Sequence, residues 1–285
     1  MASTREEAYA ACLATLRSTD LDRYLACLLV SEDKRGPLAA LYAFSAELAR
    51  IRDLIREPLP GEVRLQYWRD LIEGQPHGDS QSNPIAAGIL HAITDHRLPR
   101  SALAAMTEAR IFDLYDDPMP DRNAFEGYAG ETSAALIQLG ALILDPENAR
   151  GVSEPAGHAG IAQLVAGCLL LLPIHMRRGQ VFIPGDILSA VGLNAAGFLK
   201  GEDRQRIGAA LSAFIGYGRD HLAKARAQKS SLAGGTKLAF LTAASAEPVF
   251  NRAEKAGLTV LEKSIQPSQL SRQWRLWRAS GSRMF

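Results

Sequence analysis

Apolar residues recur at every third or fourth position over most of the chain, which is the spacing of the buried face of an amphipathic helix. In the segment 34–59, for example, Leu38, Leu41, Leu48 and Ile51 follow this period. A half-buried strand alternates apolar and polar residues instead, and no such alternation of useful length occurs. The pattern predicts helices over residues 34–59, 62–72, 84–95, 100–115, 123–144, 158–178, 204–228, 237–256 and 266–279.

Proline and glycine mark the expected breaks between these helices. Pro58 and Pro60 are expected to end the first helix, and the Gly-, Pro- and Ser-rich residues 74–84 to form an exposed loop. Residues 180–183 (QVFI) are the one strand-like segment, and Pro184 ends it. Because neither an internal repeat nor a linker interrupts the pattern, the sequence predicts one all-α domain over residues 1–285.

The composition is that of a folded protein and narrows its class. Apolar residues make up 47% of the 285 positions and charged residues 22%, a balance that supports a large core. Lys plus Arg (32) nearly equals Asp plus Glu (31), which argues against a surface devoted to nucleic acid. Residues 1–10 lack the apolar segment of a signal peptide, and the apolar run 161–174 is shorter than the ~20 residues of a spanning helix. We therefore expect a soluble, cytoplasmic protein.

The segment Y-D-D-P-M-P-D has the spacing of a magnesium-binding motif. Carboxylates at Asp116, Asp117 and Asp121 would share one helix face and could bridge a hard cation. Pro118 and Pro120 interrupt that helix, so an exposed loop is favoured and a metal site is the alternative. The sequence contains no HExxH, CxxC, GxSxG or phosphate-binding glycine loop.

Several other short segments are informative together. In chain order they are 24–26 (YLA), 41–44 (LYAF), 64–70 (RLQYWRD), 113–115 (DLY), 125–130 (FEGYAG), 160–164 (GIAQL) and 179–184 (GQVFIP). In this order they resemble the squalene/phytoene synthase family. The resemblance implies the all-α isoprenoid-synthase fold, a single domain in which antiparallel helices surround a central cavity. It also implies an enzyme that joins two prenyl diphosphates head to head with the help of Mg²⁺.

The first metal motif of that family is incomplete in this chain. The family has two adjacent aspartates and a third one three residues later, and the matching positions here are Ala49, Arg50 and Asp53. Only Asp53 remains, and Arg50 places a positive charge where the metal would bind. Near the N-terminus, Asp20 and Asp22 correspond to phosphate-contacting serines of the family, and their charges would repel phosphate.

The second metal motif has lost its polar residues altogether. The family has an asparagine, an arginine and two acids along this helix, and the chain has Ala166, Leu169, Leu170 and Ile174. These side chains cannot hold a magnesium ion, so we expect no metal and no other cofactor. Mg²⁺ would be required only if the chain were an active synthase. An apolar cavity floor at Ala166, Leu169 and Leu170 is the structural expectation.

A diphosphate could still bind without metal, because arginine and lysine can replace Mg²⁺ as the positive charge. The cationic candidates for such a site are Arg50, Arg52, His175, Arg177 and Arg178. The competing interpretation is a solvated helix end, where the helix dipole favours positive charge at the C-terminus. The full set of candidate ligand-binding residues is Tyr42, Arg50, Asp53, Gln163, Arg177 and Arg178.

The C-terminal segment 266–285 contains no acidic residue and four arginines. On a helix, Leu270, Trp274 and Trp277 share one face, and the arginines spread over the other. Such a helix can lie in an anionic membrane surface, dock on a partner, or pack on its own domain with the arginines in water. The last interpretation is favoured. The candidate membrane or partner contacts are Leu270, Arg272, Trp274, Arg275, Trp277 and Arg278.

The segments 62–72 and 272–278 resemble a non-catalytic branch of the family, which includes mitochondrial assembly factors of respiratory complex I. This resemblance implies a binding or assembly protein at or near the membrane, peripheral on its inner face. Respiratory complex subunits would then be its partners, and the cavity would hold an isoprenoid, a lipid or a partner segment. The alternative is a divergent prenyltransferase that forms squalene- or phytoene-like products.

Overall fold

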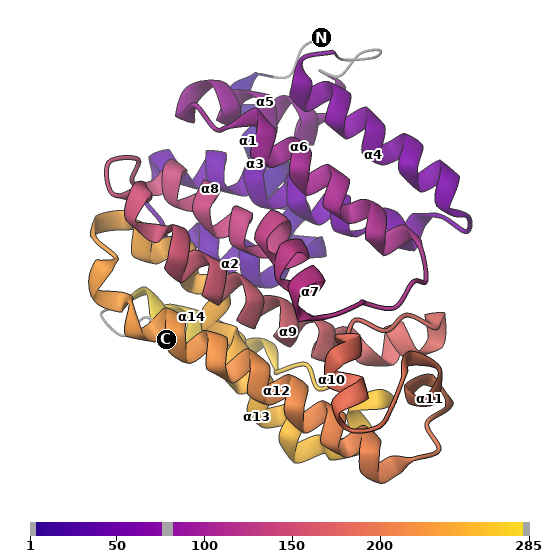
Figure 1. Cartoon of the computed structure of the whole chain (residues 1–285). Coiled ribbons are helices and arrows are strands. Elements are labelled where there is room, and N and C mark those ends of the chain that lie inside the picture. The colour runs from indigo at the N-terminus through magenta and orange to yellow at the C-terminus, as the bar shows by residue number, and fades with distance from the viewer. Residues whose placement is uncertain (1–3, 76–81, 282–285) are drawn as a thin grey trace.

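The computed structural model describes residues 4–75 and 82–281, and helices form most of that part of the chain (Figure 1). No β-strand occurs within these two ranges, so the expectation of an all-α fold is confirmed. The α-helices in chain order are α1 (Arg5–Thr19), α2 (Leu21–Leu28), α3 (Glu32–Ala49), α4 (Pro58–Glu73), α5 (Pro84–His96), α6 (Arg100–Ala109), α7 (Arg122–Ala129), α8 (Ala135–Leu144), α9 (Ser153–Arg178), α10 (Gly185–Ala190), α11 (Ala195–Lys200), α12 (Arg204–Ala227), α13 (Ala246–Ala256) and α14 (Gln269–Ser280).

Short helices of other types join the α-helices. Their tighter or wider turns let the chain change direction without leaving backbone groups unpaired. They are the 3₁₀ helices η1 (Ile51–Leu54), η3 (Arg110–Leu114), η5 (Ala149–Val152), η6 (Lys229–Ser231), η7 (Gly234–Ser245) and η8 (Gly257–Leu261), and the π-helical turn η4 (Gly130–Ala134).

Side-chain caps explain where several helices begin. At α1, Thr4 accepts a hydrogen bond from the Glu7 amide while the Glu7 carboxylate accepts one from the Thr4 amide, a complete capping box. The Asn83 side chain caps α5, and the Asp121 side chain caps α7. Each cap satisfies amide groups of the first helical turn that have no partner inside the helix.

Several predicted helix bounds differ from the structure, and the predicted ranges do not include α1, α2, α10 or α11. Pro58 starts α4 rather than ending the preceding helix. Proline suits this position because the amide of the first helical residue has no partner inside the helix, so its absence costs nothing. The helix expected over 123–144 is divided into α7 and α8 by η4. The first half of the segment 237–256 lies in the 3₁₀ helix η7 rather than in an α-helix. Most of the expected loop 74–84 lies outside the described residues.

The strand-like segment 180–183 forms no strand. It is extended chain between α9 and α10, and it pairs with the segment before α7 through one hydrogen bond, from the Met119 amide to the Val181 carbonyl at 2.9 Å. This contact joins two segments that are far apart in the sequence. It also holds the residues before α7 close to the end of α9.

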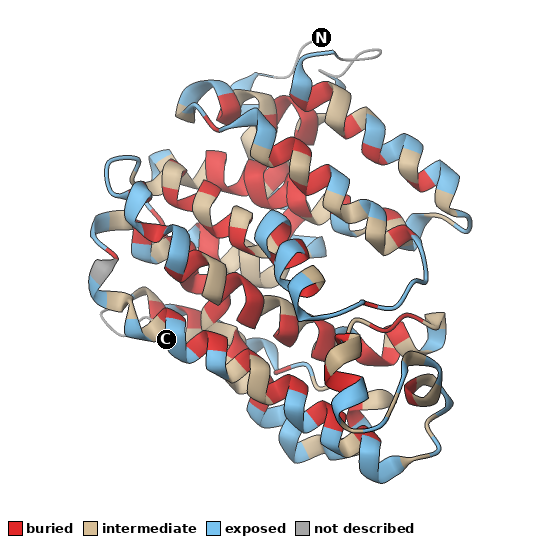
Figure 2. Cartoon of the chain, viewed as in Figure 1, coloured by how far each residue is buried: buried red, intermediate tan, exposed pale blue. Residues whose placement is uncertain are grey.

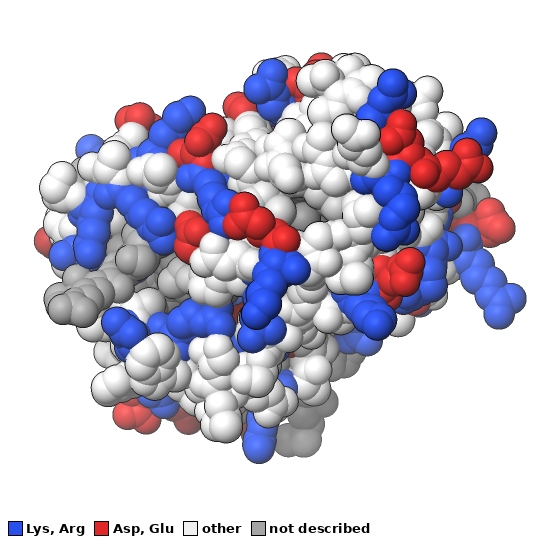
Figure 3. Space-filling view, turned by 90° about the horizontal axis from the view of Figure 1, so that it is seen from below, with Lys and Arg blue, Asp and Glu red and all other residues white. Residues whose placement is uncertain are grey.

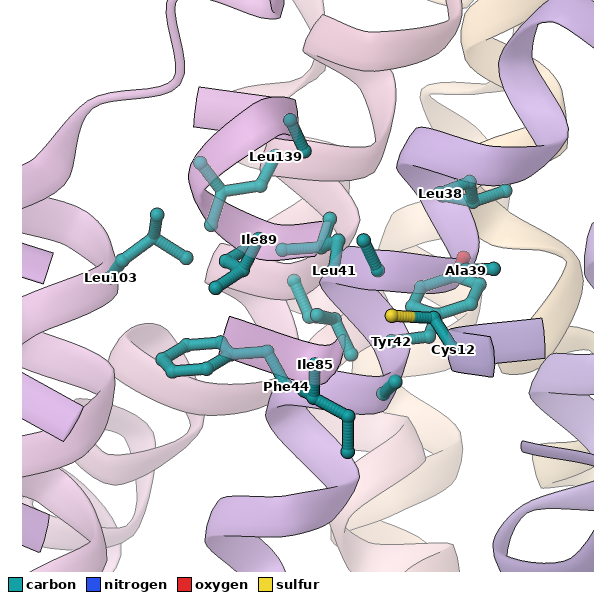
Figure 4. Close-up of a cluster of buried hydrophobic side chains, with 14 of the residues drawn as sticks. Cys12, Leu38, Ala39, Leu41, Tyr42, Phe44, Ile85, Ile89, Leu103 and Leu139 are labelled. Carbon is teal, nitrogen blue, oxygen red and sulfur yellow. The ribbon is translucent and has the colours of Figure 1, made fainter. Parts of the chain in front are cut away.

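The buried residues, red in Figure 2, belong mainly to two hydrophobic clusters. The first lies among the N-terminal helices, and Figure 4 shows its centre, where Cys12 of α1, Leu41 and Phe44 of α3, Ile89 of α5 and Leu103 of α6 converge. The second lies mainly among α7, α9, α12 and α13. A smaller group from α8, α9 and η7 is buried beside them.

The long helix α9 runs through the middle of the structure and packs along α12 (Figure 1). Within the described residues, the segment 149–178 is long and apolar enough to cross a membrane by composition alone. Its most hydropathic window is 61% buried by the surrounding helices, which is the property of a core helix in a folded protein. The apolar character of α9 is therefore explained by its central position.

Candidate functional site

A cavity of about 390 Å³ lies beside α9. Its walls come from the start of α2, the end of α3 with η1, η3, α7, α9, and the segment that joins η7 to α13. Elements of both hydrophobic clusters therefore contribute to it. The volume is in the range of pockets that bind small molecules in other proteins.

One wall of the cavity is apolar and belongs to α9. Ala166, Leu170, Leu171 and Ile174 line it, at the helical spacing that places them on one side of α9. Leu169, which we expected on the cavity floor, is buried in the second hydrophobic cluster instead. Two of the three predicted floor residues, Ala166 and Leu170, thus lie where the sequence placed them.

Four aspartates line the cavity, and each of them is paired with an arginine. The Asp53 carboxylate accepts a hydrogen bond from Arg178 at 2.5 Å, which joins η1 to the last turn of α9. Asp22 pairs with Arg272 of α14 at 2.7 Å. The remaining pairs within the cavity wall are Asp20 with Arg23 at 3.2 Å and Asp113 with Arg110 at 2.9 Å.

The pair of Asp113 and Arg110 belongs to a buried network. Arg110 donates from one guanidinium nitrogen to Asp113 at 2.9 Å and to the Tyr128 hydroxyl at 2.7 Å, and that hydroxyl donates to Asp113 at 2.7 Å. The Gln180 side chain donates to the Asp113 backbone carbonyl at 3.1 Å. Burial raises the pKa of Tyr128 well above its usual value, so the phenol keeps the proton that it donates. The network fixes η3, α7 and the segment after α9 relative to one another.

His175 adds no charge to the cavity at neutral pH. It lies in the last turn of α9 and packs against the Phe182 ring, with 4.6 Å between ring centres. Burial, together with the nearby charge of Arg178, lowers the pKa of His175 to about 4. The imidazole is therefore neutral at pH 7.

The residues present do not fit a magnesium site. Among the described residues, no group of three or more His, Cys, Asp or Glu side chains is placed to hold a metal ion. Asp53, the remaining motif aspartate, is engaged by Arg178, and apolar residues of α9 occupy the positions of the second motif. A magnesium ion prefers carboxylate oxygens, and each aspartate that lines the cavity is already paired with an arginine.

The aspartates of the Y-D-D-P-M-P-D segment lie in an irregular segment before α7, as the two prolines predicted. Asp116 accepts a hydrogen bond from Arg52 at 3.2 Å, and Asp121 caps α7. These contacts give two of the three carboxylates structural roles. Arg52, which lines the cavity, is thereby also paired.

The candidate ligand-binding residues fall into two groups. Asp53, Gln163 and Arg178 line the cavity. Tyr42, Arg50 and Arg177 do not. The Tyr42 ring is buried in the first hydrophobic cluster with the Arg23 guanidinium 5.8 Å from its centre, because the apolar face of α3 points into that core.

Arg50 and Arg177 are turned away from the cavity. Arg50 pairs with Glu47 of its own helix at 3.5 Å, and the Arg177 side chain is exposed. No role was predicted for Arg110, Asp113 or Tyr128, although two of the family-like segments contain Asp113 and Tyr128. Pairing between segments could not be read from those short matches.

The C-terminal helix α14 packs against the rest of the domain, which is the interpretation that the sequence favoured. It does so through a different face from the one that carries Leu270, Trp274 and Trp277. Leu276 and Ala279 are its buried residues, and α14 contacts η7 and α2. Leu270, Trp274 and Trp277 are 78%, 56% and 65% exposed. The predicted apolar face therefore points to solvent.

The arginines of α14 are also not simply in water, contrary to the expectation. The Arg272 side chain is only 15% exposed because it pairs with Asp22 at the cavity wall. The Arg278 guanidinium lies over the Trp274 ring, 4.5 Å from its centre. Arg275 is half-buried and donates to Ser271 at 2.5 Å. Figure 3 shows the underside of the molecule, where basic and acidic side chains lie beside one another.

Comparison with known proteins finds similarity both in sequence and in fold. The sequence model described as squalene/phytoene synthase matches residues 16–278. A dehydrosqualene synthase structure superposes with a TM-score of 0.78 at 15% identity, covering 98% of this chain and 96% of that one. The squalene synthase HpnC from Alicyclobacillus acidocaldarius gives a TM-score of 0.72 at 15% identity, covering 89% and 95%. These structures share the fold of this chain.

Relatives found by sequence similarity are named as assembly factors rather than as synthases. The mouse protein named "NADH dehydrogenase (ubiquinone) complex I, assembly factor 6" is 27% identical over 259 residues, 91% of this chain and 78% of its own length. The human protein of that name is 28% identical over 255 residues, 90% of this chain and 76% of its own. The Drosophila melanogaster homologue is 24% identical over 268 residues, 89% and 77% of the two chains.

Proposed function

Since this chain belongs to the squalene/phytoene synthase family, we propose that it uses the family's fold without the metal-dependent chemistry, as an assembly factor for a respiratory NADH dehydrogenase. The names of the mouse and human relatives, which align over 90% or more of this chain, support the assembly role. A fold alone does not define an activity, so the argument depends on the cavity.

The observation that carries the proposal is the ion pair between Asp53 and Arg178. Joining two prenyl diphosphates requires divalent cations that neutralise the leaving diphosphate. Here Arg178 of α9 is paired with the carboxylate of the remaining motif aspartate, and Leu170 and Ile174 of the same helix line the cavity. A magnesium ion would have to displace Arg178 and would still lack ligands on α9.

Two measurements test this function. We expect deletion of the gene to lower the amount and the activity of the NADH dehydrogenase, and the wild-type gene to restore both. We also expect purified protein with Mg²⁺ and farnesyl or geranylgeranyl diphosphate to release no pyrophosphate. Normal NADH dehydrogenase in the deletion strain would contradict the assembly role. Pyrophosphate release that Asp53→Asn abolishes would favour the alternative, a divergent prenyltransferase.

We also propose that the protein binds peripherally to a membrane surface. Leu270, Trp274 and Trp277 form an exposed apolar face on α14, which we call the α14 face. Tryptophan is suited to the boundary between headgroups and acyl chains, and arginines on the same helix attract anionic lipids. Asp22 neutralises Arg272, so the attraction comes from the half-buried Arg275 and the exposed Arg278. The α14 face thus supports peripheral binding to an anionic membrane.

A further inference from the structure

We propose that the cavity binds an uncharged, elongated apolar molecule with a hydrogen-bonding head, and that it discriminates against prenyl diphosphates. This inference rests on the proposed function, because it takes the cavity to be free of metal chemistry. It goes further by naming the class of ligand. Three properties of the wall lead to it: balanced charge, a continuous apolar surface, and neutral polar groups.

The charges of the cavity wall cancel. Asp20, Asp22, Asp53 and Asp113 line it, as do Arg23, Arg52, Arg110 and Arg178, and every one of these side chains has an oppositely charged partner within 3.2 Å. Two of these partners lie outside the wall: Arg272, which pairs with Asp22, and Asp116, which pairs with Arg52. Their charges are opposite, so the wall together with its partners has no net charge. The neutral His175 adds nothing.

A diphosphate would therefore enter at a high cost. Its negative charges would lose water without gaining an uncompensated cation, and burial of an unpaired charge is strongly unfavourable. Recruiting Arg178 would leave the Asp53 carboxylate without its partner. Recruiting Arg110 would break its bonds to Asp113 and Tyr128. An uncharged ligand requires neither rearrangement.

The rest of the wall suits such a ligand. The apolar stripe of Leu170, Leu171 and Ile174 on α9 faces a space of about 390 Å³. Gln163 and Thr242 provide neutral polar groups, and the Thr242 hydroxyl donates to the Gln163 side-chain oxygen at 3.2 Å. That bond engages the Gln163 oxygen, and no bond of its amide nitrogen is seen among the described residues. The nitrogen is thus a donor for a hydroxyl or carbonyl head.

A substitution at Gly167 of α9 tests whether the ligand binds inside the cavity. It lines the cavity, and a Cβ atom added there meets no atom within 4 Å. Gly167→Leu therefore adds an apolar side chain to the cavity wall from a Cβ position that is free of contacts, and leucine also favours the helix. Gly157 of the same helix has equally open surroundings and does not line the cavity, so Gly157→Leu is the matched control.

The experiment compares farnesol with farnesyl diphosphate by titration calorimetry and thermal shift on the full chain, with and without Mg²⁺. We expect farnesol to bind wild type at least tenfold more tightly than farnesyl diphosphate in both conditions. Gly167→Leu should abolish farnesol binding while raising the melting temperature, and Gly157→Leu should leave binding unchanged. Failure of farnesol to bind, or tighter binding of the diphosphate to wild type, would overturn the proposal.

A second variant tests the charge balance itself. Asp53→Asn removes one negative charge and leaves Arg178 uncompensated, so the affinity for farnesyl diphosphate should rise about tenfold while that for farnesol stays the same. Asp33→Asn, at an exposed residue of α3 that pairs with Lys34, is the control and should change neither. Unchanged diphosphate affinity in Asp53→Asn would refute the charge argument. These binding results are independent of the deletion strain, whose phenotype tests the assembly role separately.

Discussion

The α14 face gives the most direct prediction about where the protein works. Trp274→Ala together with Trp277→Ala removes both exposed rings and leaves the buried Leu276 and Ala279, which hold the helix in place. We therefore expect the double variant to fold normally and to lose most of its affinity for anionic vesicles. Retained folding is checked by circular dichroism and by the melting temperature.

The size of the loss follows from the exposed area. A tryptophan side chain has roughly 200 Å² of surface. The exposed fractions of 56% and 65% then leave roughly 240 Å² on the two rings, at about 200 Å² each. At ~25 cal/mol per Å², complete transfer from water would contribute about 6 kcal/mol. Insertion to headgroup depth realises about half of this, or about 3 kcal/mol, which is a change of about two orders of magnitude in partitioning.

Flotation with vesicles of anionic and of uncharged lipid measures the effect. The matched control is Leu59→Ala with Val63→Ala, because these α4 side chains are just as exposed, at 70% and 64%, and lie outside α14. We expect the control to float like wild type, and wild type to bind uncharged vesicles more weakly than anionic ones. Equal flotation of the tryptophan variant and wild type would refute the reasoning, as would an equal loss in the α4 control.

Two further predictions concern stability. Gly160→Ala places a Cβ 2.5 Å from the Ala134 backbone nitrogen, so we expect it to lower the free energy of unfolding by about 1–3 kcal/mol. Gly157→Ala, in open space on the same helix, should instead raise it by about 1 kcal/mol in urea titrations, and equal effects of the two variants would contradict the packing argument. For His175, the folded pKa of about 4 lies below the ordinary 6.5, so the unfolded chain binds more protons between these values. The stability that this group contributes is complete above about pH 6.5 and is lost as pH falls toward 4, by roughly 2–3 kcal/mol. His175→Gln should flatten that part of the pH profile of urea unfolding, and an unchanged profile would show that His175 titrates normally.

The helical period of the sequence predicted most helices but not their type. Residues 234–245 are rich in apolar positions, and over so short a segment the periods of 3.0 and 3.6 residues give almost the same pattern. The chain there forms η7, which packs against α8, α9 and α14. Tertiary packing, rather than local propensity, selects the tighter helix.

The amphipathic pattern of the last helix likewise identified an apolar face without showing which face is buried. Leu276 lies among the residues of the first hydrophobic cluster, whereas the tryptophans remain outside it. The choice depends on Arg272, which must reach Asp22, a residue 250 positions away in the sequence. Long-range pairings of this kind leave no periodic signal. For the same reason, the partner of Asp53, which lies 125 positions away, could be named as a candidate but not paired with it.

These long-range pairs also explain how the fold tolerates the absence of metal ligands. Carboxylates that line a cavity without cations repel one another and favour an open structure unless a metal binds. In this chain the arginines supply the positive charge permanently, so the cavity wall needs no ion to hold η1 against α9 or α2 against α14. An arginine cannot leave with a diphosphate or rearrange its coordination as a magnesium ion does. The arginine pairs thus hold these helices together without a metal ion, which is the property that both the proposed function and the proposed uncharged ligand require.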